Sequence, residues 1–263
     1  MNAIVAAALR RDLNSFVRKS FQTILPGTTY LPNWHIYAIV HQLMRIHTGE
    51  VSRLLINQPP RSLKSICVSV AYTAWVLGHD PTRRIIVVSY SAELAAELHR
   101  QFRMVIDAPW YRALFPAMRP AKDTGAELVT TAGGSRYATS VGGTLTGRGA
   151  DLIIIDDPLK SEEAMSDPAR KRVIDWYSGT LVTRLNNKDR DAIVVVMQRL
   201  TTLPVISLAR AAGSVLTCQQ SPSKTASFRQ GQANSTLGAP AKSCIRPGRA
   251  RQCLTRSRPR SAA

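Results

Sequence analysis

The stretch from Leu54 to Ser65 restricts the possible folds of this chain more than any other. It begins within an apolar run, 51–56, that predicts a buried strand, and two prolines then end the strand because proline cannot donate to a sheet ladder. Lys64 and Ser65 follow at the start of an apolar-periodic segment, 66–77, that predicts a helix. A strand, a tight loop, Lys-Ser and a helix together indicate a phosphate-binding loop, because helix N-terminal amides and the helix dipole favour an anion.

In such a loop the lysine reaches the outer phosphates of a nucleotide and the serine hydroxyl can hold Mg2+. The match to G-x-x-x-x-G-K-[ST] is incomplete, since Gln58 and Leu63 stand where glycine is usual. For the loop taken alone, the alternative is a solvated lysine at the start of a helix. The predicted nucleotide-binding residues of this loop are Gln58, Pro59, Pro60, Arg61, Ser62, Leu63, Lys64 and Ser65.

Further short apolar runs alternate with helical segments along the chain. Strands are predicted at 84–90, 152–157 and 192–197, and a hairpin at 126–141. Helices are predicted at 3–20, in a stretch that ends at His47, at 92–106 and at 167–180. The piece between Pro109 and Pro116 is expected to be irregular. This alternation predicts an α/β fold with a mostly parallel sheet flanked by helices, in which ligands bind beyond the carboxyl ends of the strands.

Two adjacent carboxylates follow the apolar run 152–155 at such a strand end. A nucleoside triphosphatase needs a phosphate cradle, a metal, a residue that activates water and a positive group for the transition state. We therefore expect Asp156 to hold Mg2+ together with Ser65, and Asp157 to orient or deprotonate the attacking water. The alternative for the two aspartates is a helix-capping turn after a strand.

Other polar residues near these strand ends have both a catalytic and an ordinary interpretation. Arg61 is a candidate arginine finger, and Gln198 with Arg199 is a candidate sensor of the γ-phosphate, but each is equally explained as a surface residue. Trp34, His35 and Tyr37 could pack on an adenine ring, although core or lid packing is the more ordinary explanation.

The charge of the chain indicates a polyanionic partner. It has 35 Lys and Arg against 17 Asp and Glu, a formal net charge of +18, which favours nucleic acid. Ten of the basic residues, but no Asp or Glu, fall within 201–263. The four cysteines show no metal-binding spacing, so a reducing compartment is expected, and no apolar run reaches the ~18–20 residues that span a bilayer.

These observations divide the chain into three parts. We predict an N-terminal helical segment at 1–50, a phosphate-loop ATPase domain at 51–200, and a low-complexity basic tail at 201–263 that is either disordered or out of frame.

Four sequence blocks carry a family resemblance: 59–65, 143–149, 152–158 and 195–200. Together they resemble the ATPase half of the large terminase subunits, the DNA-packaging motors of tailed bacteriophages and prophages. The resemblance covers about residues 31–200, and leucine in place of the last loop glycine is tolerated in some members of that family.

The resemblance implies an ASCE-type ATPase that uses ATP and Mg2+ to move double-stranded DNA into a procapsid. It implies that Arg61, Lys64 and Ser65 belong to the Walker A loop, that Asp156 is the Walker B metal ligand and Asp157 the catalytic acid, and that Gln198-Arg199 belongs to the coupling motif. It further implies a portal protein and a small terminase subunit as partners, assembly into a homo-oligomeric ring, no membrane association, and a location in the cytoplasm of the bacterial host, transiently on the procapsid.

The sequence departs from this family after Leu200. Large terminases carry a second, nuclease domain whose clustered carboxylates bind two metals, and a segment without Asp or Glu cannot build such a site, so nuclease activity is not expected. The abrupt change favours translation in a shifted reading frame over a functional basic tail. The alternatives to a packaging ATPase are therefore a truncated prophage remnant that binds nucleotide or DNA without turnover, and a helicase-like ATPase of the same broad fold.

All of these interpretations rest on one spatial expectation. Lys64 and Asp156, far apart in the chain, should meet around the same magnesium triphosphate at the rim of one sheet, and both should be open to solvent.

Overall fold

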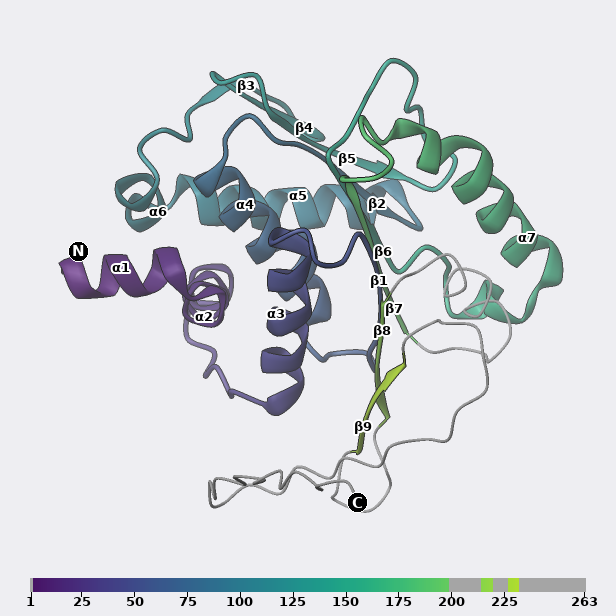
Figure 1. The fold of residues 1–263 in the computed structure, drawn as a ribbon, viewed down its shortest axis with the longest axis horizontal. Helices are drawn as coiled ribbons and strands as arrows, with labels where there is room; N and C mark the ends of the chain where they lie inside the picture. The colour runs from purple at the N-terminus through teal and green to yellow at the C-terminus, as the bar shows by residue number, and fades with distance from the viewer. Residues whose placement is uncertain (1, 199–213, 220–226, 232–263) are drawn as a thin grey trace, which may run out of the picture.

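A single sheet organises the molecule. The computed structural model describes residues 2–198, 214–219 and 227–231, and across these the sheet has the order β3-β4-β5-β2-β6-β7-β1-β8-β9 (Figure 1). The strands are β1 (Arg53–Asn57), β2 (Arg84–Ser89), β3 (Pro120–Asp123), β4 (Glu127–Thr130), β5 (Ser135–Ser140), β6 (Leu152–Asp156), β7 (Ala192–Met197), β8 (Ser214–Gln219) and β9 (Ser227–Gly231).

The strands from β5 to β8 in this order are parallel, and antiparallel pairs extend the sheet at its two ends. The predicted fold class, a mostly parallel sheet flanked by helices, is confirmed. The predicted hairpin is the β4–β5 pair. The sequence did not indicate three further strands, β3, β8 and β9, and the last two lie within 201–263, which the sequence predicted to be a low-complexity tail.

The helices lie on both faces of the sheet. They are α1 (Ala3–Arg11), α2 (Leu13–Ile24), α3 (Trp34–His47), the π-helix η1 (Ile66–Tyr72) with its continuation α4 (Thr73–His79), α5 (Ala92–Asp107), α6 (Pro109–Leu114), the 3-10 turn η2 (Glu162–Met165), α7 (Asp167–Trp176), the π-helix η3 (Tyr177–Leu181) and the 3-10 turn η4 (Val182–Arg184). Figure 1 shows α1 to α6 on one face and α7 on the other.

Two predicted helix boundaries differ from the structure for local reasons. The expected helix at 3–20 is broken at Asp12, which is extended and whose carboxylate accepts the amides of Asn14 and Ser15 as the N-cap of α2. The expectation of irregular chain after Pro109 is wrong, because Pro109 starts α6, a position where the missing N–H of proline costs nothing.

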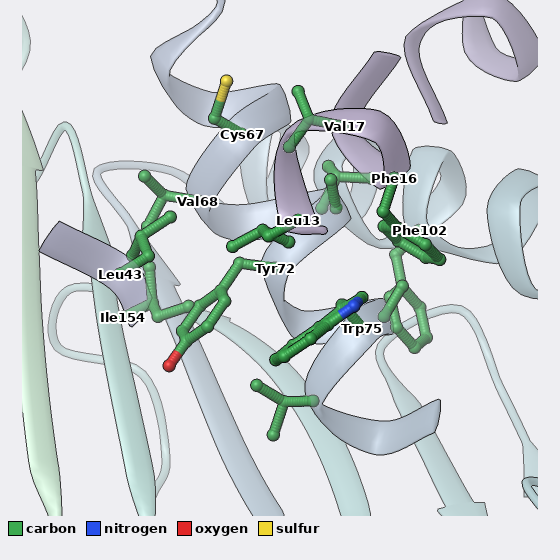
Figure 2. Close-up of a cluster of buried hydrophobic side chains, with 14 of the residues drawn as sticks. Leu13, Phe16, Val17, Leu43, Cys67, Val68, Tyr72, Trp75, Phe102 and Ile154 are labelled. Carbon is green, nitrogen blue, oxygen red and sulfur yellow. The ribbon is translucent and has the colours of Figure 1, made fainter. Parts of the chain in front are cut away.

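The central strands are buried on both faces, and alternate residues pack into two separate cores. Leu54 and Ile154 belong to the larger core, which α2, α3, η1 and α5 complete, whereas Leu55 and Ile155 belong to the smaller core. Figure 2 shows the larger core, where Tyr72 and other aromatic side chains from several helices meet aliphatic ones. This burial explains the unbroken apolar runs in the sequence, since a strand covered on both faces has no polar side.

Strand β7 separates the two strands that carry the predicted site. It pairs with β1 on one side, where Met197 is opposite Asn57, and with β6 on the other, where Val196 is opposite Asp156. The loop after β1, the aspartates of β6 and the residues after β7 therefore reach the same carboxyl edge of the sheet.

Within the described ranges, no helix combines the length and the apolar character that crossing a bilayer requires.

Candidate functional site

The loop after β1 contains two left-handed residues although it lacks the usual glycines. Leu63, at one of the two positions where glycine is usual, has a φ of 61°, and Arg61 has a φ of 58°. For a residue with a side chain, this left-handed conformation costs about 1–2 kcal/mol of conformational free energy. Gln58, at the other glycine position, does not have a positive φ and is buried at the end of the strand. Leucine therefore adopts the backbone conformation for which glycine is normally selected.

The loop is fixed by contacts with its neighbours. The N–H of Gln58 donates to the carbonyl of Met197 at 3.1 Å, and the hydroxyl of Ser62 donates to the carbonyl of Pro59 at 2.8 Å. On the outer side, Nε2 of His35 lies 3.1 Å from the carbonyl of Ser62, so the start of α3 is tied to the loop. His35 thus has a structural contact, whereas Trp34 and Tyr37 beside it are exposed.

The helix that follows presents free amides to the loop. The amide of Cys67 bonds to the carbonyl of Leu63 at 2.9 Å, which leaves the amides before it without an intrahelical partner. Unpaired amides at a helix N-terminus, together with Lys64, provide the positive environment that a phosphate group requires.

Asp156 at the end of β6 is fully buried and faces this helix. Its Oδ1 accepts the hydroxyl of Ser65 at 3.0 Å, and its Oδ2 accepts the hydroxyl of Ser69 at 2.5 Å. Burial raises the pKa of Asp156 to about 6, against the two hydroxyls and Lys64, which lower it, and with the carboxylate of Asp157 raising it further. The two hydroxyls thus hold the carboxyl group in place. Its charged form has a higher free energy than it would have in water, because the group is buried.

Asp157 receives the lysine. Nζ of Lys64 lies 2.7 Å from Oδ2 of Asp157, and the two side chains are 7% and 27% exposed. The amide of Gln198 donates to Oδ1 of Asp157 at 3.0 Å. Asp157 has a φ of 47°, so the chain turns sharply directly after β6. The carboxylate of Asp157 therefore connects Lys64, in the loop after β1, with Gln198, the residue directly after β7.

The structure brings Lys64 and Asp156 to the same edge of the sheet, through Asp157 and Ser65. The expectation that both stay open to solvent, which was a condition of the motor interpretation, is wrong: Lys64 is 6% exposed and Asp156 is 0% exposed, so a motor requires this site to open when nucleotide binds. Both side chains are covered by their hydrogen-bond partners. Lys64 lies against Asp157, and the hydroxyls of Ser65 and Ser69 lie against the carboxylate of Asp156. Access remains at Asp157, which lines a pocket of about 390 Å³ together with Tyr90, Leu159, Lys160, Ser161, Glu162 and Gln198.

The remaining predicted residues lie at the margin of this network. Arg61 is exposed at the bend of the loop, beside Pro60, which is exposed too, and Pro59, which is partly buried. Gln198 contributes its backbone amide to Asp157, and Arg199 lies outside the described residues.

Sequence reasoning missed Ser69. The only signal for it was its position four residues after Ser65, which places both hydroxyls on one side of a helix. Two further buried groups near the strand ends, Nε2 of Gln58 and Oγ of Ser89, have no hydrogen-bond partner within the part of the chain that the structure describes. Ser89 is directly opposite Asp156 in the sheet.

The donors at this edge suit Mg2+ bound with a nucleotide. The described residues contain no group of three or more His, Cys, Asp or Glu that could hold a metal alone. Mg2+ is usually bound through one or two carboxylates plus substrate phosphates and water, and the hard oxygens of Ser65 and Asp156 beside free amides and Lys64 fit that mode.

Comparisons with known proteins give the following findings. No protein-family model and no curated protein matches the sequence. Among solved structures, the fold is similar to the large terminase of bacteriophage HK97, with a TM-score of 0.47 and 12% identity over 70% of this chain. It is also similar to a mutant of the large terminase ATPase domain of a Thermus phage, with a TM-score of 0.39 and 18% identity over 68% of each chain. The match spans 37% of the HK97 protein.

Proposed function

We propose that this chain is a Mg2+-dependent ATPase of the phosphate-loop type. The observation that carries the proposal is the paired contact between two distant segments: Lys64 with Asp157 at 2.7 Å, and Ser65 with Asp156 at 3.0 Å. A solvated lysine at a helix start, or a simple capping turn after a strand, would give neither contact.

Each residue has a distinct task in this proposal. Lys64 and the loop amides bind the outer phosphates, and Ser65 with Asp156 holds Mg2+, which neutralises charge on the phosphates when bound. Asp157 orients or deprotonates the attacking water, and its accessible pocket provides the room for that water. Arg61, exposed at the bend of the loop, stabilises charge on the transferred phosphoryl group.

Nucleotide binding then requires an exchange of contacts within the protein. Lys64, now on Asp157, would turn to the phosphate oxygens and free an oxygen of Asp157, and the hydroxyl of Ser65, now on Asp156, would be one of the groups that hold the metal. Binding would therefore also free the carboxylate of Asp157 to act on the attacking water.

We further propose that hydrolysis drives double-stranded DNA into a phage procapsid in the cytoplasm of a bacterial host. The sequence blocks and the net charge of +18 support this step. A portal protein, a small terminase subunit and a homo-oligomeric ring belong to the same proposal, as does a coupling role for Gln198 and Arg199.

The test is phosphate release from Mg-ATP by the full chain. Lys64→Ala should abolish release, because the outer phosphates lose their positive partner. Lys171→Ala is the matched control, since this exposed lysine on α7 pairs with Asp175 at 2.9 Å, away from the proposed site. Hydrolysis that survives Lys64→Ala unchanged would refute the proposed site.

A second candidate is a protein that binds nucleotide without turnover. The full burial of Asp156 and the closed contact between Lys64 and Asp157 favour it, because both must open before catalysis. Wild-type release no faster than that of Asp157→Asn, with nucleotide binding retained, would identify this case.

A further inference from the structure

Ser69 connects the metal-binding carboxylate to the interior of the protein. It lies in the π-helix η1 and is fully buried, and its hydroxyl donates to Oδ2 of Asp156 at 2.5 Å. Its carbonyl accepts a second set of donors, the hydroxyl of Thr73 at 2.9 Å and a guanidinium nitrogen of Arg136 at 3.1 Å. π-Helical segments leave carbonyls displaced from the regular ladder and are frequent at functional sites.

Arg136 is unusual because it is an arginine with 0% exposure. It lies on β5, its guanidinium stacks 4.5 Å from the ring centroid of Phe102, and its other terminal nitrogen lies 2.8 Å from Nδ1 of His99. Within the described ranges it has no carboxylate at ion-pair distance, and its Nε has no hydrogen-bond partner. A buried charge without a counter-charge is costly and is normally replaced by an apolar residue unless its position serves a purpose.

The contacts of His99 fix the direction of this arrangement. An arginine can only donate, so Nδ1 of His99 accepts, and Nε2 carries the proton that it donates to the carbonyl of Thr124 at 3.1 Å. His99 is thus held neutral, since burial and Arg136 lower its pKa to about 4. Arg136 therefore donates one hydrogen bond to Nδ1 of His99 and one to the carbonyl of Ser69. A rotation of its guanidinium away from η1 would break both.

We propose that Arg136 and Ser69 are positioning residues for the metal-binding carboxylate of Asp156. Arg136 fixes the carbonyl of Ser69, the hydroxyl of Ser69 fixes Oδ2 of Asp156, and Oδ1 is thereby directed to the hydroxyl of Ser65, where the metal binds. The inference rests on the proposed function and extends it, because it assigns the control of Mg2+ affinity to residues that contact neither metal nor nucleotide.

Ser69→Ala is the principal test, with Ser20→Ala as the matched control. Ser20 is also a fully buried helical serine, but its hydroxyl has no hydrogen-bond partner among the described residues. We expect Ser69→Ala to bind ADP in EDTA as the wild type does, and to need about tenfold more Mg2+ for half-maximal ATP hydrolysis and for the Mg2+-dependent gain in ADP affinity, as is typical when a supporting contact behind a metal ligand is lost. Ser20→Ala should leave the Mg2+ requirement unchanged.

A change of packing alone would lower the melting temperature without moving the Mg2+ requirement, so the two readouts separate positioning from structure. Arg136→Met should raise the Mg2+ requirement in the same direction; if this variant does not fold, Ser69→Ala decides. A Mg2+ requirement of Ser69→Ala equal to that of Ser20→Ala, in a wild type that hydrolyses ATP, overturns this inference alone. A wild type with neither Mg2+-dependent ADP binding nor hydrolysis overturns the proposed function, and this inference with it.

Discussion

Replacing Asp156 by asparagine should stabilise the protein while it removes the carboxylate proposed to bind Mg2+. The wild-type carboxyl group has no exposed surface, and burial raises its pKa from the ordinary value of 3.8 to about 6. The folded protein therefore binds this proton more tightly than the unfolded chain does. Between about pH 4 and pH 6 the folded state holds more protons, so stability falls as pH rises through that interval and then stays level.

The size of the effect follows from the two pKa values. At about 1.36 kcal/mol for each tenfold change in proton affinity, a pKa of about 6 in place of 3.8 corresponds to about 3 kcal/mol of destabilisation at neutral pH. Asparagine keeps a similar shape and can still bond to the hydroxyls of Ser65 and Ser69, but it carries no charge. We expect Asp156→Asn to gain about 2–3 kcal/mol at pH 7.5, a rise in melting temperature of roughly 4–12 °C for a protein of this size.

The assay is urea unfolding of both proteins from pH 4 to pH 8, in EDTA and without nucleotide. The difference between the two free energies isolates this one group, because every other titrating residue is common to both. The gain should be largest above pH 6 and should fall to about 0.5 kcal/mol at pH 4, where the wild-type carboxyl group is protonated in the folded protein but about half ionised in the unfolded chain. Asp175→Asn on the exposed face of α7 is the control and should change stability by less than about 0.5 kcal/mol at any pH.

A pH-independent difference between Asp156→Asn and the wild type would refute the reasoning, as would a loss of stability at pH 7.5. Either result would mean that the carboxylate is solvated or compensated in the folded protein, contrary to its burial.

Three other perturbations give separate expectations. Asp157→Asn should cost about 2–3 kcal/mol in urea unfolding and Lys64→Met only about 1, because the first leaves a nearly buried ammonium unpaired and the second leaves a partly hydrated carboxylate; the opposite order would contradict the closed contact. Arg61→Gly should raise the free energy of unfolding by about 0.5 kcal/mol, and the melting temperature slightly, because glycine adopts a φ of 58° without strain at this exposed position. Gly134→Ala should cost about 1–3 kcal/mol, as its Cβ would lie 2.3 Å from a backbone carbonyl oxygen, while Gly125→Ala, with open space around it, should be neutral; equal melting temperatures for the two would show that the turn at Gly134 is looser than described.

The sequence predicted the strands well because each central strand is covered on both faces and therefore reads as a short apolar run. It did not predict their order. No local pattern states that β7 lies between β1 and β6, since that arrangement depends on which strands pair in space. The helix α6 was missed because Pro109 was taken as a breaker, although proline is well tolerated at the first helical position.

The site shows the same division. Lys64 and Asp156 were found because their spacing from a strand end is local, and the structure brings their segments together. Their burial was not foreseen, because it arises from contacts across the sheet. Arg136 could not be singled out either: polar residues surround it in sequence, which indicates a solvent-exposed strand, and only the packing of α5 against β5 encloses it.

The placement of β7 has a mechanical consequence. Its last carbonyl holds the loop that follows β1, at Gln58, and the amide directly beyond it holds the carboxylate that follows β6, at Asp157. A displacement of the end of β7 would therefore act on the segment that carries Lys64 and on the segment that carries Asp157. A movement of this six-residue strand would thus change the positions of both segments of the site together.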